Sequence, residues 1–143
     1  MLREPLSYKS LEHATDAIFE VNAANLEEAF VVAAKSVIET IIDTKTVDEK
    51  EEKTLTVSGI DLRYLLYNWL EEIIILTITD GFAVKTLDVK IEKNSDYKIS
   101  AKLRGEKIDI KKHHFKVEIK APTFHDMEIK QNGAVYMRYL LDL

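Results

Sequence analysis

Apolar side chains recur at helical spacing in two stretches of the first half of the chain. In residues 26–41 they lie three or four positions apart, and Asn25 directly before them, followed by two glutamates, is typical of a helix start. A second stretch with the same spacing begins near Asp61 and should end by residues 80–81, although its last turn is rich in β-branched residues. The pattern therefore predicts two amphipathic helices, each with one buried stripe.

Alternation of apolar and polar side chains predicts strands before, between and after these helices. The turn sequences Asn94-Ser95-Asp96 and Gln131-Asn132-Gly133 each join two alternating runs, as in antiparallel hairpins. Most of the strands fall in the second half of the chain. The expected strands cover residues 8–11, 17–21, 54–58, 87–91, 97–103, 115–119, 127–129 and 134–143.

The order of the elements indicates an α+β fold. The helices come early and the strands cluster late, mostly joined by hairpins, which disfavours a doubly wound parallel sheet. The chain has 143 residues, of which 46% are hydrophobic, enough for one substantial core. We therefore expect a single domain over residues 1–143, in which the two helices pack with mostly antiparallel β-sheets in a sandwich-like arrangement.

The absence of cysteine narrows the chemistry. It excludes a disulfide framework, a thiolate nucleophile and a cysteine-based metal site, and it fits a reducing compartment, so the expected location is the cytoplasm. The first residues lack the apolar segment of a signal peptide, and the longest aliphatic run, residues 73–76, is far too short to cross a bilayer. The sequence contains no nucleophile elbow, P-loop, dinucleotide-binding glycine pattern or HExxH motif.

Charge is unevenly distributed along the chain. The formal net charge is -5, yet residues 98–120 contain eight Lys or Arg residues against three acidic ones. Such a segment fits an RNA or an acidic partner, and it also fits the solvated outer faces of strands and turns, which is the commoner situation. His113 and His114 lie in this segment, and at least one of them is expected to be solvated.

Three short stretches carry the side chains best suited to chemistry. They are His13-Ala14-Thr15-Asp16, Lys120-Ala121-Pro122-Thr123-Phe124-His125 and the final pair Asp142-Leu143. Pro122 should mark a bend or a sheet edge. Asp142 ends a strand that is apolar or aromatic on both faces, so its carboxylate needs water, a cation or a donor if that end is covered; an exposed chain end is the alternative.

These stretches resemble the archease family, and the resemblance extends over nearly the whole chain. The specific parts of the resemblance are Lys120 to His125 and the co-occurrence of all the motifs in this order, since any one motif alone is a weak signal. The motifs are His13-x-x-Asp16, the helix starts Asn-Leu-Glu-Glu-Ala-Phe and Asp-Leu with Asn-Trp-Leu, the Gly105-Glu106 to His113 spacing, the Lys-Ala-x-Thr-aromatic-His run and the terminal Asp-aliphatic pair.

The sequence departs from the usual pattern of that family at four places. The order Ala14-Thr15 is reversed, Pro122 replaces a common valine, Phe124 replaces a tyrosine, and Leu143 replaces an isoleucine. Apart from the proline and the Ala14-Thr15 reversal, these changes keep the size and character of the side chain.

The resemblance implies a cytoplasmic accessory protein of tRNA splicing rather than an enzyme. Archeases assist the GTP-dependent, metal-dependent RNA ligase that joins tRNA halves, and they promote its guanylylation and its multiple turnover. They have also been proposed as chaperone-like modulators of a tRNA cytosine methyltransferase. The implied partners are therefore these two enzymes. Contact with tRNA would be indirect, through the partner enzyme, and no membrane is involved.

The resemblance also implies which residues function. The family binds a metal, calcium, through residues that correspond to Asp16, Asp142 and Leu143, the last with a backbone or terminal carboxylate oxygen. Oxygen ligands of this kind suit Ca²⁺ or Mg²⁺ rather than zinc. The functional lysine of the family corresponds to Lys120. The other residues expected to orient the carboxylates or to meet the partner are His13, Thr123 and His125.

Two other functions stay open on the residues alone. A stand-alone metal-dependent hydrolase would use Asp16, Asp142 and His125, but no base and nucleophile are recognisably arranged for it. An RNA-binding or chaperone module would act through the basic segment of residues 98–120.

Overall fold

Two helices and seven strands make up the computed structural model, which describes residues 7–12 and 15–143. The helices are α1 (Leu26–Ile41) and α2 (Leu62–Ile74), with short helical turns η1 (Thr44–Thr46) and η2 (Ile75–Thr79). The strands are β1 (Ser7–Glu12), β2 (Asp16–Ala23), β3 (Glu51–Gly59), β4 (Phe82–Lys93), β5 (Tyr97–Lys107), β6 (Ala121–Asn132) and β7 (Ala134–Asp142).

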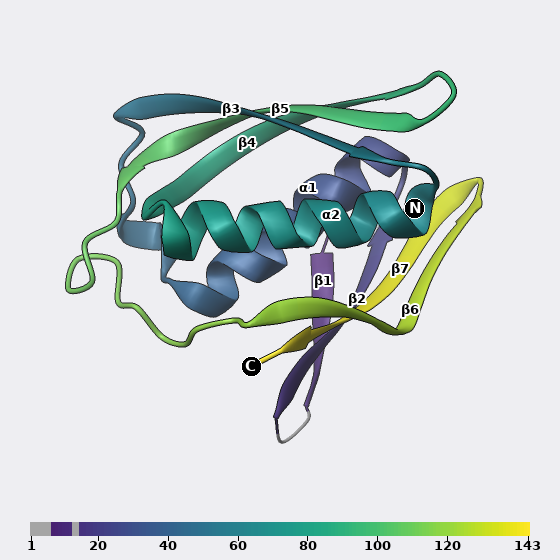
Figure 1. Cartoon of the computed structure of the whole chain (residues 1–143). Coiled ribbons are helices and arrows are strands. Elements are labelled where there is room, and N and C mark those ends of the chain that lie inside the picture. Colours follow the sequence, from purple (N-terminus) through teal and green to yellow (C-terminus); the bar gives the residue numbers. More distant parts are fainter. Residues whose placement is uncertain (1–6, 13–14) are drawn as a thin grey trace, which may run out of the picture.

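The helices lie between two antiparallel sheets (Figure 1). The larger sheet, at the bottom of the view, has the strand order β1-β2-β7-β6, and the smaller sheet, at the top, has the order β3-β5-β4. Every strand pair is antiparallel. The α+β fold expected from the sequence is therefore confirmed, with the helices as the middle of three layers.

Local signals start the helices where the sequence predicts. Asn25 and Asp61 are N-caps, and each side chain accepts a hydrogen bond at 2.9 Å from the backbone N–H three residues further on. The two helices also contact one another through the core. The indole N–H of Trp69, which is fully buried, donates to the carbonyl of Phe30 at 2.8 Å.

The core is formed by both faces of the helical layer. Phe82 enters from the smaller sheet and Tyr139 from the larger one, and both are at most 1% exposed. Burying one large apolar side chain contributes about 1.5–3 kcal/mol, so the two interfaces together supply most of the stability. In the described part of the chain, no helix is long and apolar enough to cross a membrane.

The last turn of the second predicted helix has a wider geometry than an α-helix. Residues Ile75–Thr79 form a π-helical turn, in which the N–H of Asp80 donates to the carbonyl of Ile75 at 2.9 Å. This stretch is β-branched at four of its five positions, and β-branched side chains crowd the preceding turn of an α-helix. The sequence signal for an irregular end was correct.

The prediction of a strand at residues 115–119 is wrong. This part belongs to an irregular segment, residues 108–120, that crosses from the smaller sheet to the larger one. Its backbone binds the end of α1 instead of a strand, because the N–H of Lys116 donates to the carbonyl of Ile41 at 2.7 Å and the N–H of Asp43 to the carbonyl of His113 at 2.8 Å. The alternation in the sequence arises because Ile119 is buried and Val117 half-buried.

A buried polar cluster fastens the crossing segment to the smaller sheet. His113 is fully buried; its Nδ1 accepts the backbone N–H of Asp109 at 2.9 Å, so its Nε2 carries the proton and donates to Glu106 Oε2 at 3.0 Å. Glu106 also accepts the backbone N–H of Asp48 at 2.8 Å and the ammonium group of Lys112 at 2.9 Å. The Asp48 N–H first, and then Lys112 and His113, hold the pKa of the Glu106 carboxyl far below its ordinary value.

This lowered pKa predicts a pH dependence of stability. Since the Glu106 pKa is lower in the folded than in the unfolded chain, its contribution is complete above about pH 5 and is lost progressively as the pH falls. We expect Glu106→Gln to lower the free energy of unfolding at neutral pH and to make that free energy fall less steeply below about pH 5. Urea denaturation at a series of pH values measures both effects.

The matched control is Glu51→Gln, which neutralises an exposed carboxylate on β3. This variant should keep the wild-type pH dependence. If Glu106→Gln also keeps it, the carboxylate of Glu106 does not stabilise the fold in the way described.

Candidate functional site at one end of the larger sheet

The pairing of β2 with β7 places two carboxylates opposite one another. Asp16 is the first residue of β2, Asp142 is the last of β7, and the two are directly paired across the strands. Residues paired in this way project their side chains from the same face, with Cβ atoms about 4.5–5.5 Å apart. The side chain of Asp16 is half-buried and that of Asp142 is exposed. The structure thus brings together the two aspartates singled out in the sequence.

The start of β6 and the end of the chain complete this corner of the sheet. Ala121 pairs with Asp142, and the N–H of Lys120 donates to the Asp142 carbonyl at 2.8 Å. The N–H of Leu143 donates to the carbonyl of Thr15 at 3.2 Å. In Figure 1 the C-terminus accordingly lies beside the start of β6. Lys120 and Leu143 therefore flank the aspartate pair, and the Lys120 side chain is exposed.

The remaining residues expected at the site lie further away or outside the described residues. Thr123 pairs with Leu140, and its hydroxyl accepts the N–H of His125 at 3.1 Å. Beyond Thr123 the register shifts, so that four residues of β6 oppose one of β7. His125 lies in this bulge; its side chain is 74% exposed, with Nε2 at 3.3 Å from the carboxylate of Asp126. The structure does not bring His125 to the aspartate pair, and His13 lies outside the described residues.

Helix α2 holds the bulged part of β6 in place. The ring of Phe124 stacks on Tyr67 with the centroids 4.3 Å apart, and it meets Tyr64 edge-on at 5.1 Å. The guanidinium of Arg63 lies 5.4 Å from the centroid of the same ring. Sequence reasoning did not single out these α2 residues, although an arginine and two tyrosines on one face of a helix start are a usable signal. Pro122 lies on the outer strand of the sheet, as its type predicts.

The donor set at this corner consists of oxygen atoms. In residues 7–12 and 15–143, no group of three or more His, Asp or Glu side chains is placed to hold a metal ion. The oxygen atoms at this corner include the carboxylates of Asp16 and Asp142 and the main-chain oxygens of the chain end. Such donors fit a hard cation such as Ca²⁺, which takes six to eight oxygen ligands, and water or a partner must supply the rest. They do not fit a structural zinc site.

Four of the eight basic residues in positions 98–120 have acidic neighbours. Arg104 is 2.9 Å from Asp88 and 3.4 Å from Glu52, and Lys112 is 2.9 Å from Asp48. Within the smaller sheet, Lys98 lies opposite Glu92 and Lys102 opposite Asp88 in the strand register. These neighbours favour the solvated-face interpretation over a continuous surface for RNA. Of the two histidines, His114 is exposed as expected, whereas His113 is buried.

Comparison with known proteins places the chain among close relatives. The archease protein family matches residues 8–143. The chain is 39% identical to the protein archease of Pyrococcus abyssi over 125 residues, which are 87% of this chain and 88% of that protein. It is 36% identical to the protein archease of Pyrobaculum neutrophilum over 143 residues, which are 98% of this chain and 97% of that protein.

Two solved structures share the fold. Protein 1598 of Methanobacterium thermoautotrophicum superposes with a TM-score of 0.78 at 31% identity, over 95% of this chain and 98% of that one. An archease of Thermotoga maritima, described as a possible chaperone, superposes with a TM-score of 0.60 at 19% identity, over 100% of this chain and 98% of that one.

The contacts of Phe124 predict a stability difference between two phenylalanines. Phe124→Ala removes the stacking on Tyr67, the edge contact with Tyr64 and the cation–π contact with Arg63. We expect the free energy of unfolding to fall by about 2 kcal/mol. Phe115→Ala, in the crossing segment, removes a ring that is 36% exposed and should cost less than about 1 kcal/mol. Urea denaturation compares the two variants, and equal losses would show that α2 does not anchor β6 through this ring.

Proposed function

Because the chain belongs to the archease family, we propose that it is an accessory protein of tRNA splicing that promotes guanylylation and multiple turnover of a GTP-dependent RNA ligase. The observation that carries this proposal is the strand register that gathers Asp16, Lys120 and Asp142 at one end of the larger sheet. In this role the protein acts in the cytoplasm on a partner enzyme and catalyses no reaction of its own.

A calcium-type cation would be held by the carboxylates of Asp16 and Asp142 and a main-chain oxygen of Leu143. Two like charges on directly paired residues repel one another, and a divalent cation between them offsets that repulsion. When bound, the cation supplies positive charge and oxygen-ligand exchange at the surface that meets the partner. Magnesium is a second hard cation that such donors accept.

Lys120 would meet the ligase beside the aspartate pair. Its backbone is fixed by the hydrogen bond to Asp142, while its ammonium group is exposed and able to approach phosphate oxygens or an acidic surface. At a site that transfers GMP, such a charge offsets the negative charge of the triphosphate. Thr123 and His125, further along β6, would contact the same partner.

A chaperone-like role on a tRNA cytosine methyltransferase is the second candidate. It is supported by the description of the Thermotoga maritima archease as a possible chaperone. A stand-alone hydrolase has less support, because His125 pairs with Asp126 in the bulge instead of approaching Asp16 or Asp142.

The proposed metal site predicts stabilisation by calcium. A cation that binds only the folded chain adds roughly 2.7 kcal/mol at about 100 times its dissociation constant. The melting temperature with calcium should therefore be higher than the melting temperature with a chelator. The variant Asp16→Asn should abolish this difference. Asp96→Asn, in the turn between β4 and β5, is the matched control and should keep the stabilisation by calcium. Superimposable wild-type curves up to millimolar calcium would count against the site.

The proposed contact of Lys120 predicts a loss of activation without a loss of stability. Truncating an exposed lysine should change the free energy of unfolding by no more than about 0.5 kcal/mol. A charged hydrogen bond is worth about 1.5–3 kcal/mol, so Lys120→Ala should slow single-turnover guanylylation of the cognate ligase by about tenfold or more. Lys111→Ala, an exposed lysine of the crossing segment, should activate normally. Normal activation by Lys120→Ala would show that this lysine is not at the ligase contact.

A further inference from the structure

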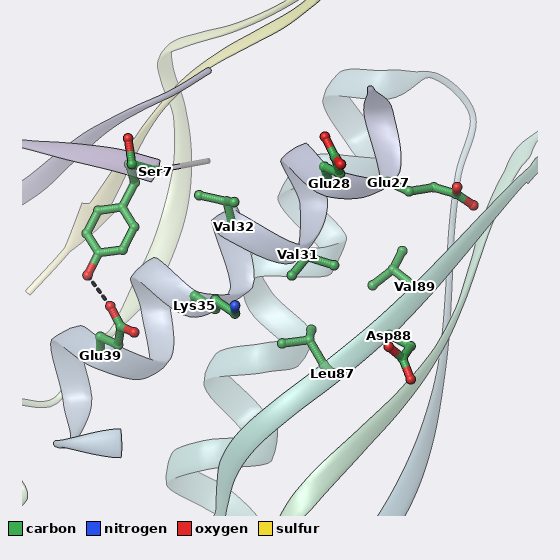
Figure 2. Close-up of a pocket in the computed structure, with 11 residues that line it drawn as sticks. Ser7, Glu27, Glu28, Val31, Val32, Lys35, Glu39, Leu87, Asp88 and Val89 are labelled. Atoms are coloured by element: carbon green, nitrogen blue, oxygen red, sulfur yellow. Dashed lines mark hydrogen bonds between the residues drawn. The ribbon is translucent and has the colours of Figure 1, made fainter. Parts of the chain in front are cut away.

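A groove of about 640 Å³ opens over α1, between the outer strands of the two sheets (Figure 2). Ser7 of β1 lines one side and β4 lines the other. Ser7 pairs with Asn22, at the opposite end of β2 from Asp16. The groove is therefore separate from the proposed metal and ligase site.

The floor of the groove is apolar and its rim is acidic. Val31 and Val32 of α1 and Leu87 of β4 line it with hydrocarbon. Glu39 lies at one end, where its carboxylate accepts the Tyr8 hydroxyl, and Glu27 lies toward the other end in Figure 2. Lys35 of α1 also lines the groove, but the glutamates of α1 outnumber it, and Asp88 of β4 is already paired with Arg104 at 2.9 Å. An acidic rim repels the phosphates of a nucleic acid and attracts lysine and arginine side chains.

Strand β4 turns an unpaired edge toward this groove. It is the outer strand of the smaller sheet and pairs only with β5 among the described strands. The N–H of Ile91 donates to Glu27 Oε2 at 2.9 Å, so it points away from β5 and toward α1. Because the direction of backbone groups alternates with a period of two residues, the N–H and C=O of Leu87 and Val89 point to the same edge.

The free edge has two defined ends. Glu27 covers the N–H of Ile91 at one end. At the other, the pairing with β5 shifts register around Lys85, whose ammonium group binds the carbonyl of Thr44 at 2.9 Å. Natural proteins protect strand edges with such bulges and charges. Residues 86–90 lie between the two protected ends and offer about 17 Å of strand.

We propose that this groove binds an extended, basic segment of a partner protein, which adds as a strand to the free edge of β4. Backbone hydrogen bonds to Leu87 and Val89 hold the segment. Its alternate side chains reach the apolar floor, and its lysine or arginine side chains reach Glu27 and Glu39. The edge selects an extended conformation and the rim selects positive charge, so the two features together define the ligand.

The test uses a short fluorescein-labelled peptide of alternating lysine and valine, blocked at both ends, titrated with the full chain and followed by fluorescence anisotropy. Saturable binding is expected. The same peptide with glutamate in place of lysine should not bind, because the rim repels it. A version with N-methyl groups on alternate residues, which removes the N–H groups that a strand partner needs, should bind at least about tenfold more weakly.

Variants of the chain test the two features separately. Val89→Pro removes an N–H from the free edge and leaves the pairing side of β4 intact, so it should weaken binding at least about tenfold. The double variant Glu27→Gln with Glu39→Gln should weaken binding about threefold or more, whereas Glu51→Gln on β3 should not change it. Thermal melting checks that each variant is folded, and the N-methylated peptide tests the same hydrogen bonds without altering the protein.

Four results would overturn the proposal. They are no binding of the basic peptide, equal binding of the N-methylated peptide, equal binding of the acidic peptide, and binding that appears only in a chain beginning at Ser7. The last result would identify the chain's own N-terminal residues as the occupant of the groove. A fifth result, dissociation of a dimer by the peptide observed by sedimentation, would identify a second copy of the chain as the occupant instead.

Discussion

The register of β7 between β2 and β6 is the constraint on which the rest of the structure depends. Val135, Met137, Tyr139 and Leu141 are at most 2% exposed, and they alternate with residues on the outer face of the sheet. The Tyr139 hydroxyl lies 2.5 Å from that of Ser36, so this face of β7 also contacts α1 through a buried polar pair. A slip by one residue would reverse every side chain of the strand. The buried face therefore fixes Asp142 opposite Asp16, and the functional corner is a consequence of core packing.

The crossing segment and α2 position this corner from the other side. His113 and Glu106 hold residues 108–120 against the smaller sheet, which sets where β6 can begin. Phe124 then packs on Tyr67, so the bulge of β6 is fixed to the helix layer. Lys120 lies between these two anchors, and its backbone position follows from both sheets.

Short sequence patterns predict the features that depend on neighbouring residues, such as helix starts and tight turns. Asn25 and Asp61 start helices because an N-cap acts on backbone groups three residues away, and the turn at residues 94–96 needs only its own residues. The error at residues 115–119 arose because Ile119 is buried by tertiary contacts that mimic strand alternation. Burial of His113 was not predictable either, since it requires Glu106 and the backbone of Asp48 to arrive from separate strands and loops.

The functional residues needed more than local pattern. Asp16 and Asp142 were paired in the sequence by resemblance to a family, because no periodicity relates residues at opposite ends of a chain. The groove over α1 was not foreseen, since it depends on which strands become the outer ones of their sheets. Glu27 and Glu39 are ordinary solvated helix residues until β4 and β1 are placed beside them.

The strand order also has a consequence for biogenesis. The smaller sheet and both helices come from one continuous part of the chain, residues 26–107, whereas β2 must pair with β7 from the far end of the sequence. Contacts between distant segments form late because closing a long loop costs entropy before any pairing is gained. During synthesis β1 and β2 leave the ribosome first, and β2 has no β7 to pair with until the rest of the chain has been made. The corner that holds Asp16 and Asp142 cannot form until β7 has been made, so a truncated or stalled chain exposes no competent site to a partner.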